Sequence, residues 1–263
     1  MVDTAIQKGR RNRRRRMGAG FLAPLAACAA FVLLLNVNAT FAYAVYEIPV
    51  LGDLGRIFTF REFQEETDTF IADVKIPNVD LSDLEGDTSW MEAINETITT
   101  TMEQSVEESI ARAEDYYKAY VETGGDPNDF FQMRIDVDYD VKYSSQNILS
   151  FVIYKCETLA SGYQENYYYN IDLKTGEEIT LEDILGRDWA EIVTEQVEQQ
   201  LEQFPEEDKA MLFTDYLNVR DVVEKGVGFY LNESGTPVVV FEKYALGAGA
   251  LGLLEFPIEV PAK

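Results

Sequence analysis

The feature that most constrains this chain is a long uncharged segment near its N-terminus. No charged side chain occurs between Met17 and Tyr46, and Phe21 to Val37 is almost entirely apolar. A helix needs about 20 predominantly apolar residues to cross the hydrocarbon core of a bilayer. The sequence therefore predicts a single transmembrane helix over residues 17–38.

Charges on either side of this segment predict its orientation. Residues 1–16 carry a net charge of +6, from seven basic residues against Asp3, and the whole chain carries −25, which leaves −31 for residues 17–263. Basic flanks stay on the cytoplasmic side of a membrane. We therefore expect a single-pass protein of the cell membrane, with a basic cytoplasmic stub at residues 1–16 and an extracellular C-terminal part. The acidic remainder would repel phosphate backbones, so no nucleic-acid partner is expected.

Two short patterns beside the apolar segment indicate processing. Leu25-Ala26-Ala27-Cys28 has the spelling of a lipoprotein cleavage box, but the hydrophobic run continues past Cys28, which also fits as an ordinary helix residue. Ala42 and Ala44 supply the small-x-small pattern that signal peptidase recognises, just after the apolar run. Spacing alone leaves constitutive cleavage and a retained anchor both open. The juxtamembrane segment with this cleavage site covers residues 39–58.

Residues 59–263 are expected to form an extracytoplasmic α+β domain. A polar, acidic stretch with Pro77 and Gly86 leads into a run from Trp90 to Tyr117 with apolar residues every three or four positions, which predicts a long amphipathic helix. The period changes to two from Gln132, which predicts a strand. Further strands are expected at residues 148–158, 167–173, 227–231, 238–244 and 256–260, and helices at residues 189–204 and in part of 206–225. The expected fold is an antiparallel sheet with helices packed on one face.

Several catalytic chemistries are excluded or weakly supported. The chain has no histidine, which excludes Ser-His-Asp triads, Cys-His pairs and His-ligated zinc. Its two cysteines are Cys28, in the predicted membrane helix, and Cys156, outside it, so no disulfide is expected. Glycoside hydrolysis needs a pair of carboxyl groups in distinct environments, and no pair is singled out among so many acids. We expect no enzyme activity and no cofactor.

Two residue clusters have both a functional and a structural interpretation. Asp136, Asp138 and Asp140 share one strand face and carry the oxygen ligands that Ca²⁺ prefers, but alternate strand positions lie about 7 Å apart, which is more typical of a solvated surface. No metal site is therefore expected. A tyrosine cluster can stack on sugar rings, although aromatic residues are also simply favoured in strands. Its members are Tyr163, Tyr167, Tyr168 and Tyr169.

Several segments of the exterior part resemble the anti-sigma-V factor family. They are Asn147-Ile148-Leu149-Ser150-Phe151, Tyr169 to Gly176 followed by Ile179 to Asp183, Phe229-Tyr230-Leu231, and Tyr244 to Gly252 with Glu255 to Ile258. The resemblance runs from about Thr59 to the C-terminus, and Phe41 to Ala44 and Ile48 to Gly52 share it. Leu159 to Tyr163 departs from the family, which usually has Gly-Gly-Ala-His-Gly there.

Members of this family are single-pass membrane anti-sigma factors whose outer domain is a receptor for lysozyme. The resemblance implies an extracytoplasmic sensor that binds lysozyme or another basic cell-wall-active protein and is then cut by signal peptidase at Ala42 and Ala44. It also implies an extracytoplasmic-function sigma factor as partner. Val2 to Arg11 resembles the last helical turns of the family's cytoplasmic segment. The alternative is an anchored cell-wall accessory or lysozyme-inhibitor domain that sends no signal.

Overall fold

A computed structural model describes residues 58–80, 89–159, 161–213 and 218–261. The predicted transmembrane helix, the cytoplasmic stub and the cleavage site at Ala42 and Ala44 lie outside these residues. Within them, no helix combines the length and the apolar character of a membrane span. The strands are β1 (Phe58–Glu66), β2 (Phe70–Val79), β3 (Met133–Ser144), β4 (Ile148–Thr158), β5 (Gly162–Asp172), β6 (Gly228–Leu231), β7 (Pro237–Phe241) and β8 (Leu254–Pro257). The helices are α3 (Trp90–Glu122), α4 (Leu181–Leu185), α5 (Trp189–Leu201), α6 (Glu206–Lys209) and α7 (Val219–Lys225), with 3₁₀ turns at Pro127–Asp129 and Gly249–Leu251.

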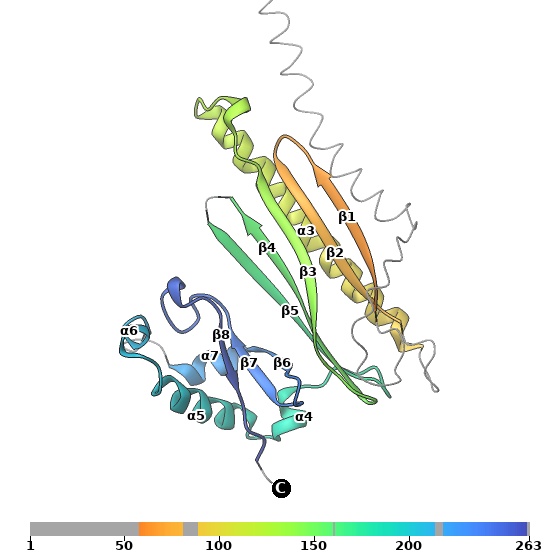
Figure 1. The fold of residues 1–263 in the computed structure, drawn as a ribbon, viewed down its shortest axis with the longest axis vertical. Coiled ribbons are helices and arrows are strands. Elements are labelled where there is room, and N and C mark those ends of the chain that lie inside the picture. The colour runs from red at the N-terminus through yellow and green to blue at the C-terminus, as the bar shows by residue number, and fades with distance from the viewer. Residues whose placement is uncertain (1–57, 81–88, 160, 214–217, 262–263) are drawn as a thin grey trace, which may run out of the picture.

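These elements form two sheets, each with its own helical layer. The larger sheet has the order β1-β2-β3-β4-β5, and the long helix α3 lies along one of its faces (Figure 1). The smaller sheet has the order β6-β7-β8, and α4, α5 and α7 contribute buried side chains to its core. The α+β class is therefore confirmed, but only α3 covers the large sheet.

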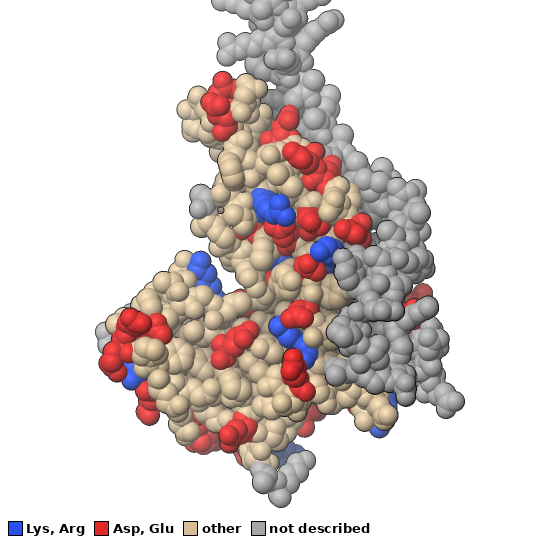
Figure 2. Space-filling model, viewed as in Figure 1, with Lys and Arg blue, Asp and Glu red and all other residues tan. Residues whose placement is uncertain are grey.

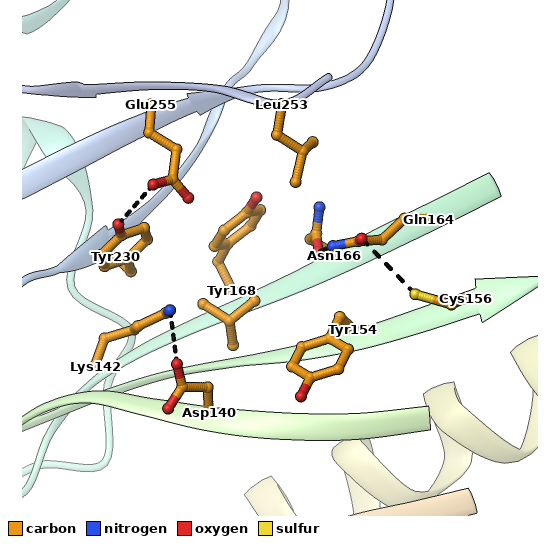
Figure 3. Close-up of a pocket in the computed structure, with 11 residues that line it drawn as sticks. Asp140, Lys142, Tyr154, Cys156, Gln164, Asn166, Tyr168, Tyr230, Leu253 and Glu255 are labelled. Carbon is orange, nitrogen blue, oxygen red and sulfur yellow. Dashed lines mark hydrogen bonds and ion pairs between the residues drawn. The ribbon is translucent and has the colours of Figure 1, made fainter. Parts of the chain in front are cut away.

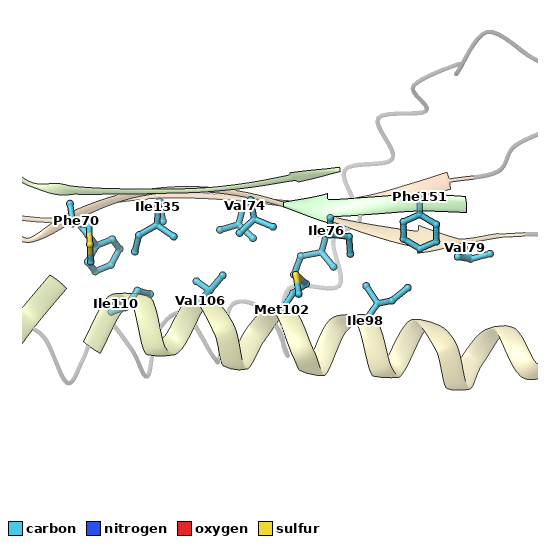
Figure 4. Close-up of a cluster of buried hydrophobic side chains, with 14 of the residues drawn as sticks. Phe70, Val74, Ile76, Val79, Ile98, Met102, Val106, Ile110, Ile135 and Phe151 are labelled. Atoms are coloured by element: carbon cyan, nitrogen blue, oxygen red, sulfur yellow. The ribbon is translucent and has the colours of Figure 1, made fainter. Parts of the chain in front are cut away.

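Helix α3 and the large sheet share the main hydrophobic core. The buried face of the helix includes Ile98, Met102, Val106 and Ile110, spaced by four residues, so they follow one side of the helix. Opposite them lie inward side chains of β2, β3 and β4 such as Val74, and Figure 4 shows the two rows facing each other. Each of these residues is at most 2% exposed, which makes this layer the main source of hydrophobic stabilisation.

The expectation of an antiparallel sheet and of a polar stretch before α3 is wrong in one region. Residues 58–79 form two strands, and β2 pairs with β3 in parallel, from Phe70 opposite Met133 to Val74 opposite Val137. The 33 residues of α3 span about 50 Å, so the helix carries the chain back to the end of the sheet where β2 began. In β2 the apolar Ile71 and Pro77 stand at positions between the inward residues, which blurred the period of two.

The other predicted elements are confirmed with small shifts. The strand predicted at residues 148–158 has these bounds in the structure, whereas β5 starts five residues earlier than predicted, at Gly162. Thr180 and Asp183 form a capping box, which starts the short helix α4.

Two buried polar side chains join the sheets. The Ser150 hydroxyl on β4 donates to the Asn170 side-chain oxygen on β5 at 2.7 Å and accepts the Leu231 N–H at 2.9 Å. The Asn170 amide donates to the Phe229 carbonyl at 2.9 Å. Ser150 and Asn170 are at most 1% exposed, so these bonds fix strand β6 against β4 and β5 in a water-free environment.

Candidate functional site

The row of aspartates on β3 is a charge-paired surface. Asp136 forms an ion pair with Arg134 at 2.7 Å, Asp138 with Lys75 at 3.1 Å, and Asp140 with Lys142 at 2.7 Å. Each carboxylate therefore has its own cation. No group of three metal-ligating side chains occurs in the described ranges.

Strand alternation separates the predicted tyrosine cluster. Tyr169 and Tyr167 pair in register with the inward residues Phe151 and Ile153 of β4, and Tyr169 stacks on Phe151 with a centroid distance of 4.9 Å. Tyr168 is on the opposite face of β5. The four tyrosines therefore form no single stacking surface, and only Tyr168 reaches the cavity described next.

A cavity of about 310 Å³ lies between the outer face of the large sheet and one face of the small one. Its walls come from five strands, β3, β4, β5, β6 and β8, and from the residue that precedes β8 (Figure 3). The lining residues are Asp140, Lys142, Val152, Tyr154, Cys156, Gln164, Asn166, Tyr168, Tyr230, Leu253 and Glu255. Aromatic rings, amides and carboxylates thus converge on one space.

Tyr168 occupies the middle of this cavity because β6 approaches it at a glycine. A Cβ atom on Gly228 would lie 2.1 Å from the Tyr168 ring, so no other residue permits this contact without movement. Burial, followed by the charges of Glu242 and Glu255, raises the pKa of the Tyr168 hydroxyl far above its usual range. Tyr168 is therefore a neutral side chain at every physiological pH.

Tyr230 and Glu255 form the β6–β8 side of the cavity. The Tyr230 hydroxyl donates to Glu255 Oε2 at 3.2 Å, and burial together with the Glu255 charge raises the pKa of Tyr230 to about 12. The Lys142 ammonium lies 5.0 Å from the centroid of the Tyr230 ring. The hydroxyl, the carboxylate and the ammonium are thus held in fixed relative positions.

Two amides on β5 form the opposite rim. The Gln164 amide donates to Asn166 Oδ1 at 2.7 Å, and the Asn166 amide donates to Glu242 Oε1 at 3.2 Å. Burial raises the pKa of Glu242 above its ordinary value, although the hydrogen bonds from Asn166 and Tyr168 oppose the shift. The thiol of Cys156, which is free, approaches Gln164 Oε1 at 3.7 Å.

A separate ionic cluster is buried between α3 and the sheet. Lys155, 1% exposed, places its ammonium 2.7 Å from Glu165 Oε2, 3.3 Å from Glu157 Oε1 and 3.2 Å from the Ser105 carbonyl. Arg112 also pairs with Glu157. Two cations and two anions thus neutralise one another, and the cluster has the character of a structural network.

Neither the cavity nor the ionic cluster was predicted from the sequence. The departure at Leu159 to Tyr163 lies at the turn between β4 and β5, where Tyr163 is 55% exposed.

Acidic side chains are spread over the visible face of both sheets, with few basic ones between them (Figure 2). Negative charge is therefore spread widely over this face of the molecule.

Comparison with known proteins gives a sequence relative. The chain is 25% identical to the anti-sigma-V factor RsiV of Bacillus subtilis strain 168 over 265 residues, which covers 98% of this chain and 86% of that protein. No protein-family profile matches the chain. The resemblance predicted from the sequence is confirmed by this relative.

A solved structure shares the fold. A member of the DUF3298 family from Bacteroides fragilis NCTC 9343 superposes with a TM-score of 0.52 at 16% identity, covering 76% of this chain and 90% of that one. A DUF3298 protein from Pseudomonas aeruginosa PAO1 gives a TM-score of 0.45 at 10% identity, with 76% and 88% covered. The first match places the two-sheet architecture among known folds.

Proposed function

We propose that this protein is a membrane-anchored anti-sigma factor whose extracytoplasmic domain senses a basic cell-wall-active protein such as lysozyme. Ligand binding leads to cleavage by signal peptidase at Ala42 and Ala44, and cleavage releases an extracytoplasmic-function sigma factor held at the cytoplasmic side. The observation that carries this proposal is the match to RsiV over 98% of the chain, because it includes the N-terminal region as well as the exterior domain.

Charge supports a basic ligand for the exterior domain. The net charge of −31 after residue 16 attracts a cationic protein over long distances and speeds encounter at low salt. Charge alone does not give specificity, because the Debye length at physiological ionic strength is about 8 Å. Selective binding at that ionic strength therefore has to come from shape and from desolvated contacts.

The sigma-factor role is tested by a transcription reporter. Cells carry the chain, each candidate sigma factor in turn and a promoter read by that sigma factor. The anti-sigma role predicts low expression that rises on deletion of the chain and on addition of lysozyme. Reporter expression that is the same with and without the chain, for every sigma factor tested, contradicts the anti-sigma role. Lysozyme binding without any transcriptional response would instead identify an anchored inhibitor.

Ligand selectivity is tested by calorimetry on the full chain in lipid nanodiscs at low and physiological salt. Lysozyme is compared with cytochrome c, a basic protein of similar size. Submicromolar binding of lysozyme at physiological salt, with much weaker binding of the control, supports the proposal. Equal affinity for both proteins, or complete loss of lysozyme binding at physiological salt, would reduce the interaction to unspecific attraction.

Processing is tested at Ala44. Signal peptidase accepts only small side chains at this position, so Ala44→Trp should abolish the lysozyme-dependent fragment, and the matched variant Ala44→Ser should retain it. Immunoblots with tags at both ends report the fragments. An unchanged fragment in Ala44→Trp removes this site from the mechanism.

A further inference from the structure

The cavity between the two sheets presents aromatic rings that no other ring covers. Tyr154, Tyr168 and Tyr230 come from β4, β5 and β6, one from each strand. Among the described residues, none of the three stacks on another aromatic side chain. Tyr168 uses part of its ring surface against Gly228. Ring surface therefore remains available to a ligand, and aromatic rings contribute large contact areas with few rotatable bonds.

Hydrogen-bonding groups surround these rings and are held in place by their own contacts. Glu255 accepts the Tyr230 hydroxyl through Oε2, so its second oxygen can accept a further bond. The amides of Gln164 and Asn166 are fixed by each other and by Glu242. Ring faces alternate with planar acceptors and donors, an arrangement that does not suit a purely apolar ligand.

The ammonium of Lys142 disfavours a cation on its side of the cavity, although the lining as a whole, with Asp140 and Glu255, has a formal net charge of −1. Lys142 is paired with Asp140 at 2.7 Å and lies 5.0 Å from the centroid of the Tyr230 ring. One side of the cavity is thus already occupied by an ammonium group. A second cation on this side would meet repulsion from Lys142, whereas a neutral polar molecule would not.

From these contacts we propose that the cavity binds a mono- or disaccharide. A pyranose ring has an apolar face of C–H groups that packs on an aromatic ring, and an equatorial belt of hydroxyls that donate to carboxylates and accept from amides. Both surfaces are matched here, by the tyrosine rings and by Gln164, Asn166 and Glu255. The volume of about 310 Å³ lies at the lower end of ligand pockets, which fits one or two sugar rings.

This proposal is independent of the anti-sigma function, since it concerns only the exterior fold. The test is saturation-transfer NMR on the full chain in lipid nanodiscs, which avoids detergents with sugar head groups. The probes are cellobiose and N,N′-diacetylchitobiose, with n-butylammonium as the cationic comparison. We expect transfer to the ring protons of at least one disaccharide, with a Kd of about 1 mM or tighter.

Matched tyrosine variants locate the site. Tyr154→Leu and Tyr230→Leu should each weaken binding about tenfold, which is the effect of one aromatic contact. Tyr163→Leu is the control, because Tyr163 is on the opposite face of β5 and 55% exposed, and it should leave the affinity unchanged. Circular dichroism confirms that each variant is folded. Glu255→Gln, at an exposed position, gives a severalfold loss without altering the core.

Three results would overturn the proposal. The first is the absence of transfer to either disaccharide at about 10 mM, ten times the expected Kd. The second is wild-type affinity in folded Tyr154→Leu and Tyr230→Leu variants, or in the folded Glu255→Gln variant. The third is stronger transfer to n-butylammonium than to the sugars, which would assign the cavity to cationic ligands.

Discussion

Replacing Lys155 with methionine tests whether the buried ionic cluster stabilises the fold. Methionine keeps most of the side-chain volume but removes the ammonium group, which leaves Glu165 and Glu157 without their shared cation. Removal of one partner from a buried ion pair typically costs 3–5 kcal/mol. The lower end applies here, because Glu157 keeps Arg112 and Glu165 is 32% exposed. We expect a loss of about 3 kcal/mol, or a fall in Tm of about 6–12 °C for a domain of this size.

The penalty should also depend on pH. Burial by itself raises the pKa of Glu157, but the hydrogen bonds from Arg112 and Ser109 and the charge of Lys155 outweigh it, so the pKa is lowered from 4.5. The pKa of Glu165 is also lowered, since the bond and charge of Lys155 outweigh burial. An acid with a depressed pKa stabilises the fold above its unfolded value and loses that contribution as the pH falls through the folded value. The difference between wild type and Lys155→Met should therefore be greatest near neutral pH and shrink below pH 4.5.

Urea unfolding of residues 58–263, followed by circular dichroism at neutral and acidic pH, measures both effects. Lys142→Met is the control, because Lys142 is 30% exposed and its pair with Asp140 lies at the surface, where such pairs contribute about 0–1 kcal/mol. A loss in Lys155→Met no larger than in the control would refute the argument. So would a penalty that stays constant from neutral to acidic pH.

Three further substitutions test other parts of the structure. Met102→Ala, at a position with 0% exposure, should lower the unfolding free energy by about 2–5 kcal/mol in urea denaturation. Asn170→Leu removes the bond to the Phe229 carbonyl and should lower the unfolding free energy by about 1–3 kcal/mol. Relative to wild type, amide hydrogen exchange should accelerate more in β6 than in β2. Gly228→Ala should displace the Tyr168 ring and weaken saccharide binding in the NMR assay, while far-ultraviolet circular dichroism stays unchanged.

Local patterns in the sequence predicted the elements whose partners are close along the chain. The alternation from Gln132 and the run at residues 148–158 predicted β3 and β4, which pair as a hairpin across a short turn. The spacing of apolar residues in α3 predicted its buried face, because side chains three and four residues apart lie on one side of a helix. The parallel pairing of β2 with β3 was missed, since it depends on 53 intervening residues between Val79 and Met133 and no local pattern specifies it.

The cavity and the ionic cluster were missed for a related reason. Tyr154, Tyr168 and Tyr230 stand on three different strands, and the adjacent tyrosines around Tyr168 suggested a cluster that strand alternation divides. No sequence pattern marked Lys155 as buried: Glu165 is its cross-strand partner in the β4–β5 hairpin, and Ser105 becomes a neighbour only when α3 packs on the sheet. The resemblance segments include Ser150, Asn170 and the Phe229–Leu231 strand, so part of that signal reflects the joint between the sheets.

The position of β1 at the edge of the large sheet sets how far the fold stands from the predicted cleavage site. The chain enters β1 at Phe58, which pairs with Val79, so tension on the preceding residues would open the β1–β2 ladder one pair at a time from that end. Thirteen residues separate Ala44 from Phe58 and reach at most about 45 Å when extended. Release of the nine residues of β1 would add about 30 Å of slack. The nine residues of β1 would thus add a length comparable to the extended span of residues 45–57.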